Sequence, residues 1–188
     1  MMGFAIKKER RYTYKDYLTW PENERWEIID GVVYNMTPAP KVRHQRIVSR
    51  IDYEFTIKLK ECLHFVAPTD VVFDEQNVVQ PDLFVICDKS KVTEDNIQGT
   101  PDLIIEVVSP GTEVKDRREK KDIYERFGVK EYIIVFPERE YVERYCLKEN
   151  KYGSSEIFNW DEVLNLSTFE IEINLCEIFE KEKEGGQV

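Results

Sequence analysis

The sequence predicts a mixed α/β fold in which helices pack against a central mixed sheet. Two β-rich arms joined by Asp30-Gly31 are typical of a β-hairpin with a two-residue turn. Apolar residues recur at helical spacing across residues 44–60, which indicates an amphipathic helix. Short apolar runs, at 103–108 and 131–137, are typical of strands that are buried on both faces of a sheet.

The remaining elements follow from apolar periodicity and from the prolines and glycines that end helices and strands. Pro21 ends a short helix, Gly128 is a natural C-cap, and Pro81 is tolerable at an edge or a bulge of a strand. In the first half of the chain we expect a helix over 13–21, a hairpin over 25–36, a helix over 44–60 and strands over 64–74 and 77–87. The second half should begin with a strand over 99–110 and a helix over 114–127. A hairpin of strands over 131–137 and 141–147 and weaker strands over 155–160 and 169–174 should follow. No GxGxxG or GxxxxGK(S/T) pattern is present, so a doubly wound nucleotide-binding fold is not expected.

Length and composition are those of one globular domain, which we place over residues 1–188. The chain is 41% hydrophobic and 34% charged, which is typical of a soluble protein rather than a disordered or membrane one. No apolar run is long enough to span a bilayer, and the N-terminal residues do not resemble a secretory signal. The cysteines are scattered, so we expect reduced thiols in a cytoplasmic protein. They are Cys62, Cys87, Cys146 and Cys176.

The charge of the chain is unevenly distributed. A net charge of −10 argues against a protein that coats nucleic acid through its overall field. Residues 41–46 and 114–121 are nevertheless locally basic, whereas residues 170–184 are strongly acidic. An acidic protein can still bind nucleic acid on one basic face, so composition leaves this question open.

Two acidic residues stand in neighbouring apolar segments: Asp82 within 77–87 and Glu106 within 99–110. An ionised carboxylate in an apolar strand is heavily disfavoured unless a positive group compensates it. If the two strands pair, both carboxylates point at one spot, where a divalent cation would neutralise their repulsion. Oxygen ligands without a His/Cys cluster suit Mg²⁺ or Mn²⁺ better than Zn²⁺. The sequence therefore predicts a magnesium site, while the structural alternative pairs each acid with an arginine or a lysine, or places it at a strand end near solvent.

Several motifs follow one another in a fixed order along most of the chain. They are YKDYL, WEIIDGVVYNMTPAP followed by HQRI, VVQPDLFVI, GTPDLIIEVVSPGT, and the D-x3-K-x3-Y pattern of Asp116, Lys120 and Tyr124. Together they resemble the Uma-type family of endonuclease-like proteins, a branch of the PD-(D/E)xK restriction-endonuclease-like superfamily. The resemblance implies a restriction-endonuclease-like central mixed sheet flanked by helices, with an additional N-terminal β-hairpin. It also implies that Asp82 and Glu106 are Mg²⁺ ligands.

The sequence departs from the superfamily pattern at the lysine. In an ordinary ExK motif the lysine follows the glutamate by two positions, and that position here is Val108. Within the Uma-type family the lysine comes from the following helix, so the resemblance assigns the catalytic role to Lys120. Lys115 and Lys121 lie on the same helix, and a solvated helix lysine is the alternative for all three.

Further residues are candidates for the same site. The resemblance implies that Glu27, on the first arm of the hairpin, completes it, whereas residue type alone predicts an exposed strand acid. His44 opens the amphipathic helix and could contact phosphate or transfer a proton, or it could cap or pack the helix. Asp102 is four positions before Glu106 and so points to the same face of the strand, but we expect it to accept a backbone hydrogen bond. We expect Tyr124 to lie in the core.

These residues lead to one main functional hypothesis. It is a metal-dependent endonuclease that hydrolyses phosphodiester bonds in DNA, with Mg²⁺ on Asp82 and Glu106 and with Lys120 orienting the attacking water. The alternative is a non-catalytic nucleic-acid-binding or protein-interaction module built on the nuclease scaffold. Glycoside hydrolysis by paired carboxylates is a third class, and the placement of the acids on interior strands counts against it. We expect a homodimer, because two such sites are needed to cut both strands.

Overall fold

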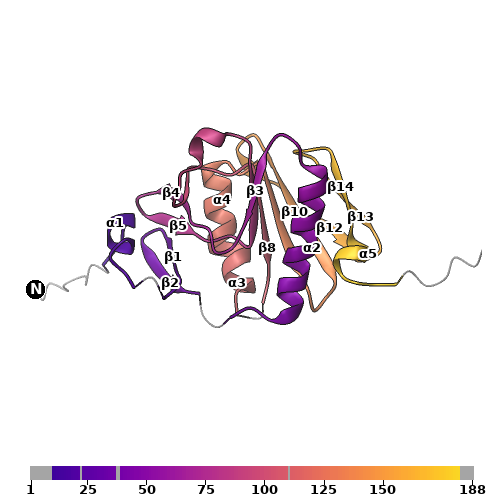
Figure 1. Ribbon diagram of the computed structural model, residues 1–188, viewed down its shortest axis with the longest axis horizontal. Coiled ribbons are helices and arrows are strands. Elements are labelled where there is room, and N and C mark those ends of the chain that lie inside the picture. Colours follow the sequence, from indigo (N-terminus) through magenta and orange to yellow (C-terminus); the bar gives the residue numbers. More distant parts are fainter. Residues whose placement is uncertain (1–9, 22, 37–38, 110, 183–188) are drawn as a thin grey trace, which may run out of the picture.

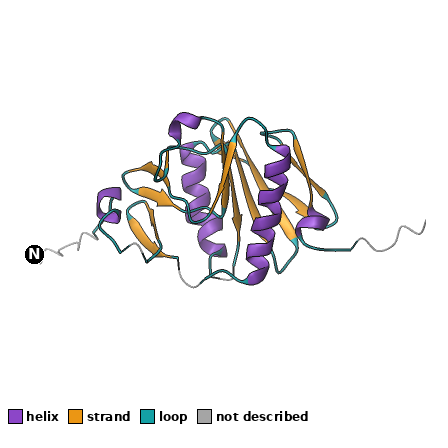
Figure 2. Cartoon of the chain, in the orientation of Figure 1, coloured by secondary structure: helices purple, strands orange, loops and turns teal. Residues whose placement is uncertain are grey.

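The computed structural model describes residues 10–21, 23–36, 39–109 and 111–182 and shows a mixed α/β fold (Figure 1 and Figure 2). Its largest sheet has seven strands, in the order β11-β10-β9-β8-β6-β3 with β12 paired to β10. Strands β8 and β9 are parallel and their neighbours pair antiparallel, so the sheet is mixed, as predicted. These strands are β3 (Leu63–Val66), β6 (Leu83–Ile86), β8 (Leu103–Val107), β9 (Glu131–Phe136), β10 (Tyr141–Lys148), β11 (Lys151–Tyr152) and β12 (Glu156–Asn159).

A smaller, five-stranded sheet carries the N-terminal hairpin, in the order β2-β1-β5-β4-β7. Its strands are β1 (Trp26–Ile29), β2 (Val32–Asn35), β4 (Val71–Asp74), β5 (Asn77–Val79) and β7 (Ile97–Gln98). The predicted hairpin turn is confirmed: Asp30 and Gly31 have φ values of 49° and 73°. Two consecutive residues with positive φ are what a two-residue type I′ turn requires. A third sheet pairs β13 (Val163–Leu166) with β14 (Ile171–Asn174).

Helices cover both faces of the large sheet (Figure 1). The helical elements of the described chain are α1 (Tyr14–Tyr17), which packs on the small sheet, α2 (Val42–Lys58), the 3₁₀ turn η1 (Lys89–Lys91), α3 (Glu113–Lys115), the π-helical turn η2 (Asp116–Lys120), α4 (Lys121–Phe127) and α5 (Leu175–Ile178). Among the residues placed by the structure, no helix is both long and apolar enough to cross a bilayer.

The two faces of β8 belong to two different hydrophobic cores. Leu103 and Ile105 pack in the core that includes α2, whereas Ile104 packs in the core that includes Ile123 and Tyr124 of α4. Successive side chains of a strand point to opposite faces. Glu106 therefore faces the side that η2 and α4 cover.

Two strand predictions were wrong in extent. The segment 64–74 divides into β3 and β4, and the segment 77–87 divides into β5 and β6. In each case the two halves belong to different sheets. Pro68 and Pro81 stand at the breaks, where a residue without an N–H cannot continue a hydrogen-bonded ladder. The second break places Asp82 immediately before β6 rather than inside a strand.

The helix predicted over 114–127 is present, but it is not uniformly α-helical. Its middle, η2, is a π-helical turn between α3 and α4. Both ends of this turn, Asp116 and Lys120, are buried. π-Helical turns of this kind occur frequently at functional sites.

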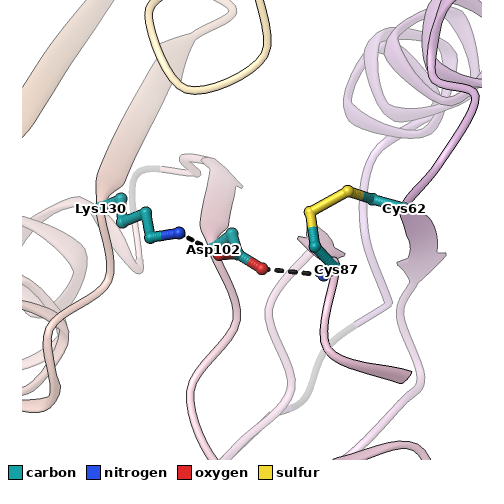
Figure 3. The surroundings of a disulfide bond; sticks show 4 residues. All are labelled: Cys62, Cys87, Asp102 and Lys130. Carbon is teal, nitrogen blue, oxygen red and sulfur yellow. Dashed lines mark hydrogen bonds and ion pairs between the residues drawn. A yellow bond between two sulfur atoms is a disulfide. The ribbon is translucent and has the colours of Figure 1, made fainter. Parts of the chain in front are cut away.

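Two of the four cysteines are joined in a disulfide, Cys62 to Cys87 (Figure 3). The antiparallel ladder of β3 and β6 places these residues opposite each other, with their Cα atoms 4.2 Å apart. The prediction of reduced cysteines was therefore wrong for this pair, because a separation of 25 positions gives no local spacing signal. Cys146 and Cys176 are free thiols.

Candidate functional site

Asp82 and Glu106 lie opposite each other where two paired strands meet a cavity. Strands β6 and β8 pair with Leu83 opposite Ile105, so the next facing pair is Asp82 and Glu106. The backbone N–H of Val107 donates a hydrogen bond of 2.8 Å to Oδ2 of Asp82 and ties it to the Glu106 strand. Both acids line a cavity of about 670 Å³. The two segments thus pair and bring both carboxylates to one place.

The positive group beside Glu106 is a lysine from the helix. Glu106 is only 3% exposed, and its Oε1 accepts a hydrogen bond of 2.8 Å from Nζ of Lys120. The hydroxyl of Tyr124 donates to the same oxygen at 2.7 Å. Val108, which takes the position of the ordinary ExK lysine, packs in the hydrophobic core. Lys120 therefore supplies an ammonium to the acid pair from a different element.

Glu27 joins this group from the small sheet. It is 0% exposed, and its Oε1 lies 2.8 Å from Nζ of Lys120. The same oxygen accepts a 3.1 Å hydrogen bond from the backbone N–H of Gln80, while Oε2 pairs with Lys115. The expectation of an exposed strand acid was wrong, because β1 lies between β2 and β5 and turns Glu27 towards the two lysines. One buried carboxylate thus holds both lysines.

Burial changes the proton affinity of the acids unequally. Burial is the main cause that raises the pKa of Glu106 to about 8; the nearby Asp116 and Asp82 act in the same direction, and Lys120 acts against them. Burial also raises the pKa of Asp116 to about 6, again against Lys120. Burial alone would raise the pKa of Glu27, but Lys120 and Lys115 together hold it below its ordinary value. The three acids around Lys120 therefore differ in pKa: those of Glu106 and Asp116 are raised, and that of Glu27 is lowered.

Lys120 remains a cation in this environment. It is 2% exposed, and burial by itself would lower its pKa. Glu106, Glu27 and Asp116 outweigh that effect and keep the pKa of Lys120 well above its ordinary value. The site therefore contains a permanent positive charge within hydrogen-bonding distance of the acid that lines the cavity.

His44 contacts the second acid from α2. Its Nε2 lies 3.1 Å from Oδ2 of Asp82, so a protonated Nε2 donates to that carboxylate. Its Nδ1 is buried and has no hydrogen-bond partner among the described residues. All five residues that the sequence proposed for the site therefore lie around or directly behind one cavity. They are Glu27, His44, Asp82, Glu106 and Lys120.

Asp102 lies outside this group, as expected. Its Oδ2 accepts a 2.8 Å hydrogen bond from the backbone N–H of Cys87, and its Oδ1 pairs with Lys130 at 2.7 Å (Figure 3). Tyr124 is 0% exposed, so the prediction of a core residue is confirmed. Its hydrogen bond to Glu106 could not be foreseen from residue spacing alone.

Two members of the site were missed from the sequence. Lys115 was only one of several lysines on the helix, yet it is the one that shares Glu27 with Lys120. Asp116 stood out only as the first residue of the D-x3-K-x3-Y pattern, and its carboxylate lies 3.8 Å from Nζ of Lys120. The π-helical turn that begins at Asp116 could not be foreseen from apolar periodicity.

The donor set at the cavity fits magnesium. Within the ranges that the structure describes, no group of three or more histidine, cysteine or acidic side chains is arranged to hold a metal ion. Mg²⁺ is commonly bound by one or two carboxylates together with water and substrate phosphates. The facing carboxylates Asp82 and Glu106 meet that requirement, whereas a structural Zn²⁺ would need four protein ligands.

The mixed sheet thus carries two facing acids and a buried lysine beside one cavity. The chain belongs to the Uma2 family, which is described as "Putative restriction endonuclease" and whose profile matches residues 14–176. The resemblance seen in the sequence is thereby confirmed.

Two individual proteins are similar to this chain. An uncharacterised protein of Synechocystis sp. is 30% identical over 127 residues, which span 64% of this chain and 66% of that protein. The match thus spans just under two thirds of that relative's length. The crystal structure of a protein from Anabaena variabilis, described as a putative nuclease of the DUF820 family, is 19% identical. It superposes with a TM-score of 0.75 over 89% of this chain and 97% of that one, which shows a shared fold.

Proposed function

We propose that this protein is a magnesium-dependent endonuclease that hydrolyses phosphodiester bonds in DNA. The observation that supports the proposal most directly is the buried Lys120, hydrogen-bonded to Glu106 on the cavity that Asp82 also lines. The description of the Uma2 family and the fold shared with the Anabaena protein support the same class of enzyme.

Each polar side chain at the cavity has a distinct role in this proposal. Asp82 and Glu106 would hold Mg²⁺, and Mn²⁺ suits the same oxygen ligands. When bound, such an ion lowers the pKa of a coordinated water and offsets charge on a phosphoryl oxygen. The ammonium of Lys120 orients the attacking water and stabilises the negative charge that develops on the phosphate.

Neighbouring groups fix the orientation of these side chains. The hydroxyl of Tyr124 and the ammonium of Lys120 both bind Oε1 of Glu106, so the carboxylate cannot rotate freely. The N–H of Val107 and Nε2 of His44 both meet Oδ2 of Asp82. Side chains held in this way lose little freedom when the substrate arrives.

A non-catalytic module remains the second candidate, and one observation favours it. The ion pair of Lys120 with Glu106 and Glu27 is complete within the protein, so it can stabilise the fold without a ligand. In that case the scaffold would serve nucleic-acid or protein binding alone.

Cleavage of supercoiled plasmid separates the two candidates. The parent protein should convert the plasmid to open-circular and linear forms in Mg²⁺ and should leave it intact in EDTA. Unchanged plasmid in both Mg²⁺ and Mn²⁺ would favour the non-catalytic module. We also propose a homodimer, since cutting both strands needs two such sites, and the molar mass in solution tests it.

A further inference from the structure

The cationic side chains of the cavity differ in whether they are neutralised. Those that line it are Arg25, Lys41, Arg43, Lys115 and Lys120. Four of them pair with carboxylates: Lys41 with Glu138, Arg43 with Glu140, Lys115 with Glu27, and Lys120 with Glu27 and Glu106. Arg25 is the exception, since its guanidinium has no acidic partner among the residues that the structure places. Arg25 is therefore the cation of this cavity that no carboxylate in the described part of the chain neutralises.

Arg25 is nevertheless held in position. Its Nε donates a 2.9 Å hydrogen bond to Oε1 of Gln80, a side chain that is only 7% exposed. Gln80 is fixed in turn, because its Nε2 donates to Oδ1 of Asp70 at 2.8 Å and its backbone N–H donates to Glu27. The chain of contacts anchors Nε of Arg25. Neither Nη atom of Arg25 has a hydrogen-bond partner among the described residues.

An anchored guanidinium of this kind matches a particular ligand chemistry. The planar N–H groups of arginine fit two oxygens of a phosphate at once, and such charge-assisted pairs are stronger than neutral hydrogen bonds. A DNA strand in this cavity, as the proposed function requires, presents such phosphates along its backbone. Arg117 of the basic helix is a poorer candidate, since it pairs with Glu143 and does not line the cavity.

We propose that Arg25 binds a phosphodiester group of the strand that occupies the cavity, and that Gln80 is a positioning residue for it. This inference rests on the proposed nuclease function and adds a phosphate-binding subsite to it. The subsite lies where the small sheet borders the cavity, so the hairpin sheet contributes to substrate binding as well as to the lysine pair.

Binding of a short fluorescent DNA duplex, measured in Ca²⁺ over a range of salt concentrations, tests the inference. Arg25→Ala should weaken binding about tenfold and should reduce the slope of log affinity against log salt by about one. Arg25→Lys should keep the slope and lose part of the affinity, because a point charge replaces the planar fork. Gln80→Ala should weaken binding less than Arg25→Ala, with an unchanged slope.

Lys151→Ala is the charge-matched control, because Lys151 is 79% exposed and lies outside this cavity. An unchanged slope in Arg25→Ala, or an equal change in Lys151→Ala, would overturn the phosphate site. If the parent protein binds DNA but does not cleave it, the proposed nuclease activity is overturned and the phosphate site is not. The slope of log affinity against log salt in Arg25→Ala would still decide whether Arg25 binds a phosphate. Melting temperatures of all variants show that they are folded.

Discussion

The two ends of strand β8 carry acids that are an even number of positions apart, and their surroundings are very different. Asp102, just before the strand, pairs with Lys130, whose side chain is 64% exposed. Glu106, four positions later, pairs with Lys120, whose side chain is 3% exposed. An exposed pair contributes about 0–1 kcal/mol, whereas removing one partner of a buried pair costs about 3–5 kcal/mol. The accessibility of the cation, rather than the acid itself, separates a surface ion pair from a candidate catalytic one.

The largest expected effect is at the buried end. Glu106→Gln should abolish magnesium-dependent plasmid cleavage, because an amide is a weaker metal ligand than a carboxylate. The variant should be as stable as the parent in EDTA, since Lys120 keeps Glu27 and Asp116 as partners and the amide replaces a carboxyl group that burial keeps protonated below about pH 8. The melting temperature in EDTA checks the stability of Glu106→Gln. Asp82→Ala should likewise lose cleavage and keep its melting temperature in EDTA. A large loss of melting temperature in both variants would identify structural ion pairs instead.

The next effect separates two adjacent lysines. Lys120→Ala should lower cleavage at least about tenfold, which is the order of a single charge-stabilising contact. Lys121→Ala should stay within about threefold of the parent, because its ammonium lies over the ring of Tyr145 and away from the acids. Initial rates of plasmid cleavage at saturating Mg²⁺ provide the measurement. The reverse ranking would remove Lys120 from the mechanism.

Lys120→Ala needs a control for stability, because it leaves buried acids without their cation. A double variant, Lys120→Met with Glu27→Gln, removes the lysine and one of the acids that it compensates. We expect this variant to melt closer to the parent than Lys120→Ala does and to remain inactive. Recovery of cleavage in the double variant would show that Lys120 acts only through stability.

The pH dependence of stability also distinguishes the buried end. Burial raises the pKa of Glu106 to about 8, from an ordinary value of 4.5. Its contribution to stability is therefore complete below the ordinary value and is lost as pH rises through about 8, since the unfolded chain releases that proton earlier. We compare the unfolding free energies of the parent and of Glu106→Gln in EDTA. The value of the parent minus that of the variant should fall as pH rises, by at most about 1.4 kcal/mol per pH unit. Denaturant titrations at several pH values measure it, and a difference that grows with pH would contradict a protonated Glu106.

The smallest effect is expected at the exposed end. Asp102→Asn keeps an oxygen that accepts the hydrogen bond from Cys87 and loses only the charge that pairs with Lys130. We expect cleavage within about twofold of the parent and a stability change of about 1 kcal/mol or less. A strong loss of activity in this variant would mean that the two ends of β8 are coupled.

Local chemistry predicted the parts of this molecule that short segments determine. Asp30-Gly31 specifies a tight turn by itself, and the spacing of Lys120 and Tyr124 places both on one side of a helix. The apolar run around Glu106 indicated that its carboxylate must meet a positive group. These inferences need no knowledge of distant segments.

The parts that were not predictable depend on which distant segments meet. Nothing near Lys115 shows that it shares Glu27 with Lys120, because that contact joins the two sheets. The disulfide of Cys62 with Cys87 depends on the register of β3 and β6. Periodicity also cannot show where Pro81 transfers the chain from one sheet to another.

The position of Glu27 also constrains the order of events during synthesis. Glu27 leaves the ribosome long before Lys115, which follows 88 positions later, and Lys120 comes later still. Until both lysines are available, burying this carboxylate would leave it without a counter-charge. The hairpin can form early from its own turn, but the small sheet docks only after the helix with the lysines has emerged. A nascent chain arrested before that helix would carry Glu27 in water, and the cavity would not yet exist.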